Sequence, residues 1–127
     1  MQHRELRAVT VWLGDDGIVR ADMKPGVATQ DLTDAHESVA AQAALCDGVR
    51  RPVLVNMGDI QSLSRECRKY YSGPEPAKVR SACAVLVGSP VARAIGNFFI
   101  GVNKSVVPTR LFTSEPEAVA WLKEFVT

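Results

Sequence analysis

The chain opens with a regular alternation of apolar and polar residues. Residues 7–14 follow the two-residue period of a half-buried β-strand. Residues 15–17, Asp-Asp-Gly, suit the positive backbone φ of a tight hairpin turn, and residues 18–23 resume the strand pattern. This pattern predicts an N-terminal β-hairpin. The positions that it turns toward the core are Val9, Val11 and Leu13.

Helical spacing follows at residues 31–46. Asp31 can cap the N-terminus of this helix, and Gly48 stands where a helix commonly ends. Intervals of three and four residues mark one face of the helix. The apolar members of that face are Leu32, Ala35, Val39, Ala43 and Cys46.

Three further helices are predicted by their starting residues. Ser64 can cap a short polar helix to Tyr71, and Ser89-Pro90 begins a helix to about residue 103. Residues 114–117, Ser-Glu-Pro-Glu, form a capping-box pattern ahead of a final helix. The apolar face expected on the helix after Pro90 comprises Val91, Ile95, Phe98 and Val102.

Continuous apolar runs separate these helices. Residues 52–57 and 82–87 are typical of strands buried on both faces, and residues 109–113 predict one more strand. The order is therefore ββαβαβαβα. It predicts a single α/β domain over residues 1–127, with a mixed, mostly parallel sheet, an N-terminal hairpin and helices packed on the sheet.

This order, read with VLVNMGDIQSLSREC at residues 53–67, resembles the STAS domain, the fold of bacterial anti-sigma-factor antagonists. The ending TRLFTSEPEAVAWL, residues 109–122, is similar to that of small bacterial STAS-like proteins of uncharacterised role. In that family a partner kinase phosphorylates a serine of an Asp-Ser-Ser-Gly segment, which switches binding to an anti-sigma factor. Here Arg65 and Glu66 stand at the two serine positions. The resemblance therefore implies the fold without the phosphoacceptor.

The predicted helix start at Ser64 is one candidate binding site. A helix N-terminus offers free N–H groups, and Arg65 and Arg68 add positive charge that favours a phosphate or an acidic partner. Asp59, in the preceding loop, completes this candidate anion or partner site. The alternative is that Ser64 is only a cap and the basic residues lie on a solvated helix face.

A second candidate surface comes from a surplus of apolar residues. Phe99 and Ile100 point about 100° and 200° around the helix from Phe98, so one face does not bury all three. Together with Trp121, these residues form a candidate apolar interface or pocket. The alternative is burial beneath a neighbouring helix or the 104–108 loop.

Motifs for catalysis and cofactors are missing from the chain. Residues 88–96, GSPVARAIG, lack the glycine spacing of a dinucleotide site, and no phosphate-binding GxxxxGK[ST] or nucleophile-elbow GxSxG motif occurs. His3 and His36 form no recognisable pair, and the cysteines do not follow zinc-ligand spacing. We therefore predict no catalytic, cofactor-binding or metal site.

Composition narrows the possible binding partners and the expected cellular compartment. With 15 Lys and Arg against 14 Asp and Glu, the net charge is +1, which gives no overall electrostatic attraction for nucleic acid. No apolar run approaches the roughly 18 residues of a membrane span. Three widely spaced cysteines, Cys46, Cys67 and Cys83, fit a reducing compartment, and the strand pattern begins without a leader. We expect a cytoplasmic protein.

Three functions are compatible with these patterns. The first is a non-catalytic regulatory or protein-interaction domain that binds a protein partner or a second copy as a homodimer. The second is a carrier or sensor for a small apolar, lipid-like ligand, since STAS-like folds are similar to the core of CRAL-TRIO lipid-transfer domains. The third is an anion-binding regulatory module at Ser64 and Arg65.

Overall fold

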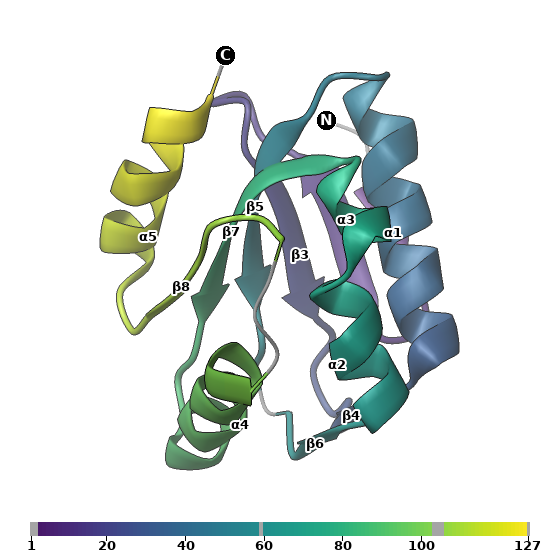
Figure 1. The fold of residues 1–127 in the computed structure, drawn as a ribbon, viewed down its shortest axis with the longest axis vertical. Helices are drawn as coiled ribbons and strands as arrows, with labels where there is room; N and C mark the ends of the chain where they lie inside the picture. The colour runs from purple at the N-terminus through teal and green to yellow at the C-terminus, as the bar shows by residue number, and fades with distance from the viewer. Residues whose placement is uncertain (1–2, 59, 103–105, 127) are drawn as a thin grey trace.

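A six-stranded mixed sheet forms the centre of the molecule, and it runs in the spatial order β1-β2-β3-β5-β7-β8 (Figure 1). The computed structural model describes residues 3–58, 60–102 and 106–126, with the backbone alone at 96 and 98–102. The first three strands are antiparallel, and β3, β5, β7 and β8 are parallel to one another. The strands are β1 (His3–Glu5), β2 (Val9–Leu13), β3 (Val19–Met23), β5 (Arg51–Asn56), β7 (Arg80–Leu86) and β8 (Thr109–Phe112).

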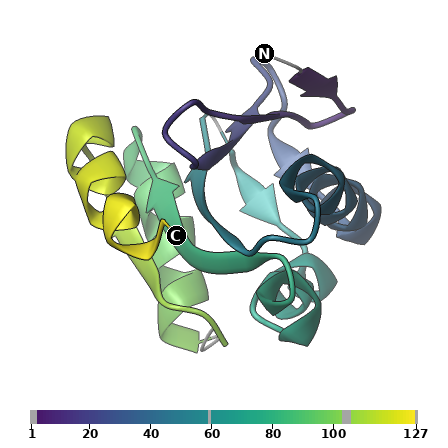
Figure 2. The same ribbon diagram turned by 90° about the horizontal axis from the view of Figure 1, so that it is seen from above.

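Helices cover both faces of this sheet. Figure 2 shows α1 and α2 on one side and α5 on the other, whereas α4 lies at the carboxyl ends of the parallel strands in Figure 1. The helices are α1 (Leu32–Cys46), α2 (Arg65–Tyr71), α3 (Pro74–Ala77), α4 (Pro90–Val102) and α5 (Glu115–Leu122), which continues into a 3₁₀ turn (Lys123–Phe125). A separate two-stranded parallel sheet pairs β4 (Thr29–Gln30) with β6 (Ser62–Leu63).

Alternation along the buried strands divides the core into two clusters. On β5, Val53 and Val55 pack on the α1 side, whereas Leu54 packs on the α5 side. On β7, Cys83 and Val85 pack on the α1 side, whereas Ala82 and Ala84 pack on the α5 side. The α5-side cluster consists of Ile18, Leu54, Ala82, Ala84, Phe112, Ala118 and Leu122. The predicted α/β class, its mixed sheet and its helices are confirmed.

Local capping explains why α1 begins where it does. The Asp31 side chain accepts a hydrogen bond from the Asp34 N–H at 3.0 Å, and the Asp34 carboxylate accepts one from the Asp31 N–H at 3.0 Å. Arg7 also donates to Asp34, with its Nε 2.8 Å from Oδ1. The helix therefore starts at a reciprocal cap that is tied to the segment before β2.

The predicted capping box before α5 does not form. Ser114 occupies the N-cap position, but its side chain makes no cap hydrogen bond. Pro116 has no N–H, so one of the two donors that a cap oxygen normally accepts is missing. Packing, rather than the cap, therefore holds the start of α5.

The sequence pattern misplaced two helix faces. On α1, Ala43 is exposed, whereas Ser38 and Gln42 are buried, because those two polar side chains hydrogen bond with each other at 3.1 Å. On α4, Val91 is 44% exposed although it was expected on the buried face. The side chains of Phe98 and Val102 lie outside the described residues.

Several short elements were also missed. Strand β1 adds a third antiparallel strand to the predicted hairpin, with the His3 ring stacked on Trp12 at a centroid distance of 4.9 Å. The pair β4–β6 and helix α3 lie in segments for which the pattern predicts no helix or strand. Elements of two to four residues carry too little periodicity to be read from the sequence.

Candidate ligand cavity

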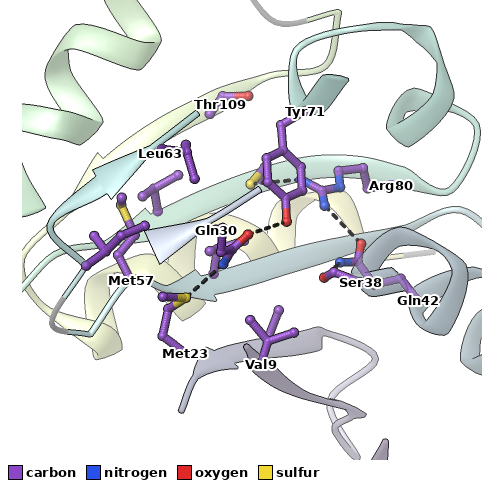
Figure 3. A pocket seen from close by; sticks show the side chains of 15 residues that line it. Val9, Met23, Gln30, Ser38, Gln42, Met57, Leu63, Tyr71, Arg80 and Thr109 are labelled. Atoms are coloured by element: carbon purple, nitrogen blue, oxygen red, sulfur yellow. Dashed lines mark hydrogen bonds between the residues drawn. The ribbon is translucent and has the colours of Figure 1, made fainter. Parts of the chain in front are cut away.

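A cavity of about 70 Å³ lies between the sheet and helices α1 and α2 (Figure 3). Its lining is mostly apolar and comes from β2, β3, β5, β7 and β8, with two helices and the β4–β6 region closing it. The apolar residues that line it are Val9, Ala21, Met23, Val55, Met57, Ile60, Leu63, Cys83 and Val85. One water needs about 10–15 Å³ on such a measure, so the space admits several atoms of a ligand.

Polar side chains form the first of two hydrogen-bonded groups on the cavity wall. The Tyr71 hydroxyl, at the end of α2, donates to Oε1 of Gln30 at 2.9 Å. Nε2 of Gln30 then contacts Sδ of Met23 at 2.8 Å. Figure 3 shows Gln30 reaching from β4 between these two side chains. The group connects α2 to β3 across the cavity wall.

The second group centres on Arg80, the first residue of β7. Its NH2 atom donates to Oε1 of Gln42 at 3.0 Å, and NH1 lies 3.5 Å from Sγ of Cys83. The guanidinium also sits over the Tyr71 ring, 5.6 Å from its centroid. Gln42 in turn donates to the Ser38 hydroxyl. Arg80 is only 3% exposed, so this is a buried cation in an apolar setting.

Burial changes the acidity of the groups around the cavity. It raises the pKa of the Tyr71 hydroxyl well above its usual range. Burial also raises the pKa of the Cys83 thiol, although nearby Arg80 acts in the opposite direction. Both groups therefore keep their protons at neutral pH, and the wall presents a hydroxyl and a thiol rather than anions.

The cavity is accessible from solvent. Val55, near the carboxyl end of β5, is only half-buried. Leu63, Tyr71 and Thr109, which line the same cavity, are half-buried as well. A small molecule therefore has a route to the wall without unfolding of either helix.

The candidate anion site lies at the start of α2, outside this cavity. The Ser64 hydroxyl accepts the Cys67 N–H at 3.1 Å, as the capping alternative expects. Arg65 is exposed, and NH1 of Arg68 donates to the Leu63 carbonyl at 3.0 Å. Asp59 lies outside the described residues. The anion site stays a prediction.

The candidate apolar set is only partly described. Trp121 belongs to the α5 side of the sheet, where its ring contacts Phe112 and Phe125 at centroid distances of 5.7 and 5.0 Å. Arg110 lies over the same ring at 5.5 Å. The side chains of residues 98–100 lie outside the described residues. Trp121 therefore packs on the face opposite the cavity and does not line it.

Sequence reasoning assigned none of the cavity-lining residues to a site. Arg80 gave one signal, because it is a charge at the head of an otherwise apolar strand. Ser38 and Gln42, four residues apart beside the apolar stripe of α1, gave another. Neither signal says that these side chains meet, since α1 and β7 are brought together only by the fold.

The described ranges offer no grouping of His, Cys, Asp and Glu side chains suited to a metal ion. Within the same ranges, none of the helices has the length and apolar character that crossing a membrane requires.

Comparison with solved structures defines the class of fold. An uncharacterised DUF3478-family protein from Shewanella loihica PV-4, described as having a SpoIIAA-like fold, superimposes with a TM-score of 0.59. It is 15% identical, and the match covers 91% of this chain and 92% of that chain. The chain therefore has a SpoIIAA-like fold, and its resemblance to the STAS domain is confirmed.

The family follows from the sequence itself. Residues 11–126 match the model of DUF7793, a domain of unknown function, and the chain belongs to this family. A protein with unknown function from Arthrobacter sp. FB24 is 38% identical, with 88% of this chain and 96% of that chain covered and a TM-score of 0.35. Comparison with curated proteins finds no match.

Proposed function

We propose that this chain is a non-catalytic regulatory domain that responds to a small, mostly apolar molecule held in the cavity beneath α1 and α2. The observation that supports this most directly is the cavity itself, an accessible and largely apolar space with a few fixed polar groups. Such a combination is the common form of a small-molecule site, in which apolar walls supply affinity and polar groups fix orientation.

The polar groups on the wall favour binding over catalysis. Gln30, Tyr71, Gln42 and Arg80 hydrogen bond to one another or to neighbouring side chains, which fixes their positions. The thiol on the wall, Cys83, is a poor nucleophile, because burial raises its pKa. These features suit a rigid recognition surface.

The position of the cavity supports a regulatory role. Its walls belong both to the sheet and to α2, a helix of seven residues. A ligand that contacts Tyr71 on α2 and Val85 on β7 favours whichever position of α2 gives the better contacts. The occupied and empty forms then present different surfaces around α2.

Binding can be tested by NMR with two simple probes, 1-hexanol and hexanoate. We expect either probe to shift the methyl resonances of Val9, Val55 and Val85 and to leave those of Ala84 and Leu122, on the opposite face, unchanged. The absence of cavity-specific shifts with both probes would overturn the proposed function.

Blocking variants make this test specific. Ala21 is 3% exposed and lines the cavity, so Ala21→Leu fills part of the space and should abolish the shifts. Val85→Leu is a second blocking variant with a smaller change in volume. Ala120→Leu is the matched control, because Ala120 is exposed on α5 and the same added bulk leaves the cavity unchanged.

Association with a protein partner or a second copy is a second candidate function. It is supported by an exposed apolar side chain on α4, Val91, which is 44% exposed. Sedimentation velocity of Val91→Ser should show weaker self-association than the parent chain. Val49→Ser is the control, because Val49 is 41% exposed but precedes β5 at the other end of the sheet. A parent chain that is monomeric at high concentration contradicts the homodimer.

A further inference from the structure

Arg80 is a buried positive charge without a negative partner among the described residues. The ion pairs within the described ranges join Arg7 to Asp34, Arg20 to Asp16, Lys24 to Glu5 and Lys78 to Glu75. Arg80 instead contacts an amide oxygen, a thiol and an aromatic ring, and its Nε has no hydrogen-bond partner in the described part of the chain. Its charge is therefore solvated by neutral groups only.

Such an arrangement is unfavourable unless something else compensates it. A guanidinium keeps its charge in proteins and presents five N–H donors, of which neutral acceptors here satisfy only some. Removing a cation from water carries a large desolvation penalty, which a carboxylate partner offsets better than an amide does. The position of Arg80 on a cavity wall allows that partner to be a ligand.

We propose that the cavity binds a monocarboxylate with a short apolar tail, whose carboxylate pairs with Arg80. This inference rests on the proposed function and specifies the ligand class of the same cavity. From Arg80 the apolar lining continues along β7 through Cys83 and Val85 and onto β5 through Val55. The tail lies along this lining while the carboxylate meets the guanidinium, a pairing that gives strong charge-assisted hydrogen bonds.

Charge and size distinguish the proposed monocarboxylate from other anions. One arginine balances one negative charge, so a phosphate dianion leaves excess charge in a mostly apolar space. Acetate balances the charge but leaves the apolar lining unfilled. A cavity of about 70 Å³ holds about five to seven water-sized positions of about 10–15 Å³ each, which suits a monocarboxylate of about six carbon atoms.

Calorimetric titration of hexanoate, 1-hexanol, acetate and inorganic phosphate tests the proposal. We expect hexanoate to bind the parent chain at least about tenfold more tightly than 1-hexanol, and acetate and phosphate to bind more weakly than either. Arg80→Met should lose the preference for hexanoate while keeping the affinity for 1-hexanol. Arg80→Gln serves the same purpose should the methionine variant fail to fold.

A matched arginine provides the control. Arg110 is exposed and lies over Phe112 and Trp121 on the opposite side of the sheet, so Arg110→Met should bind hexanoate like the parent. Equal binding of hexanoate and 1-hexanol, or unchanged hexanoate binding by Arg80→Met, overturns the carboxylate proposal but leaves the proposed function standing. Failure of both probes to bind overturns both.

Discussion

The two faces of the sheet bury similar apolar side chains, but the described residues place buried polar ones on only one of them. Beneath α5 the buried cluster is entirely apolar, with Leu54 and Leu122 at its centre. On the α1 and α2 face, Ser38, Gln42 and Arg80 are buried among valines and surround a cavity. We call the side beneath α5 the apolar face and the side beneath α1 and α2 the cavity face. The apolar face contributes mainly to stability, whereas the cavity face contains polar groups and empty space that a close-packed core excludes.

This difference teaches where to look for function. Burying a polar group is unfavourable unless it is hydrogen bonded, so a folding core has no need of Arg80. On the apolar face, α5 needs no cap hydrogen bond because apolar contacts hold it. On the cavity face, α1 begins at a capping box whose Asp34 pairs with Arg7, and α2 begins at the Ser64 cap. Three predictions test this contrast, beginning with the largest effect.

Truncating one leucine on each face should give unequal losses of stability. Leu122 is fully buried in close-packed surroundings, so Leu122→Ala should lower the free energy of unfolding by about 2–5 kcal/mol. Leu63 is half-buried against existing space, so Leu63→Ala removes fewer contacts and should cost about 1 kcal/mol. Urea denaturation measures both values. Equal losses of stability would contradict the division of the sheet into an apolar face and a cavity face.

Acid should weaken the cavity face through Asp34. Hydrogen bonds from Arg7 lower the pKa of this carboxyl below its usual value. A lowered pKa in the folded state contributes stability that is present above the unfolded value, near 4, and is lost as pH falls through the folded value. Asp34→Asn should therefore lower the urea midpoint at neutral pH and reduce its fall on acidification.

The hairpin supplies a control for this pH effect. Arg20 lowers the pKa of Asp16 in the same way, at a site away from α1. Asp16→Asn should remove a separate part of the acid dependence, and the double variant should have the flattest profile. An acid dependence that Asp34→Asn leaves unchanged would show that the Arg7 pair adds nothing to stability.

The smallest predicted effects come from the two serine caps. Ser64 bonds to the Cys67 N–H, so Ser64→Ala should cost about 1 kcal/mol. Ser114 makes no cap bond, so Ser114→Ala should change the stability by only a few tenths of a kcal/mol. Thermal unfolding of the two variants gives the comparison. A larger loss of stability in Ser114→Ala than in Ser64→Ala would contradict the view that capping stabilises the start of α2 and packing stabilises the start of α5.

The sequence predicted elements well where their signals are local. The strand alternation at residues 7–14, the cap at Asp31 and the Ser89 start of α4 all recur in the structure, where Ser89 accepts the Ala92 N–H at 3.1 Å. These features depend on neighbours within four residues. The face of α1 was predicted only in part, because the burial of Gln42 depends on a partner 38 residues away.

The candidate sites show the same limit. Ser64 was recognised as a cap because capping is local, but Trp121 was grouped with residues 98–100 although it packs against Phe112 and Phe125. The cavity was not predicted at all. Its lining comes from seven strands and two helices, and no pattern within one segment specifies how those elements meet.

By itself, the sequence determined the order of elements, the α/β class and the near-neutral charge, because periodicity, capping and composition are properties of short segments or of their sum. Only the tertiary structure decided that the two sides of the sheet differ. It brought Arg80, Gln42 and Tyr71 together from β7, α1 and α2, and it left space beside them. Burial and unpaired charge are relations between distant segments, so they exist only once the chain has folded.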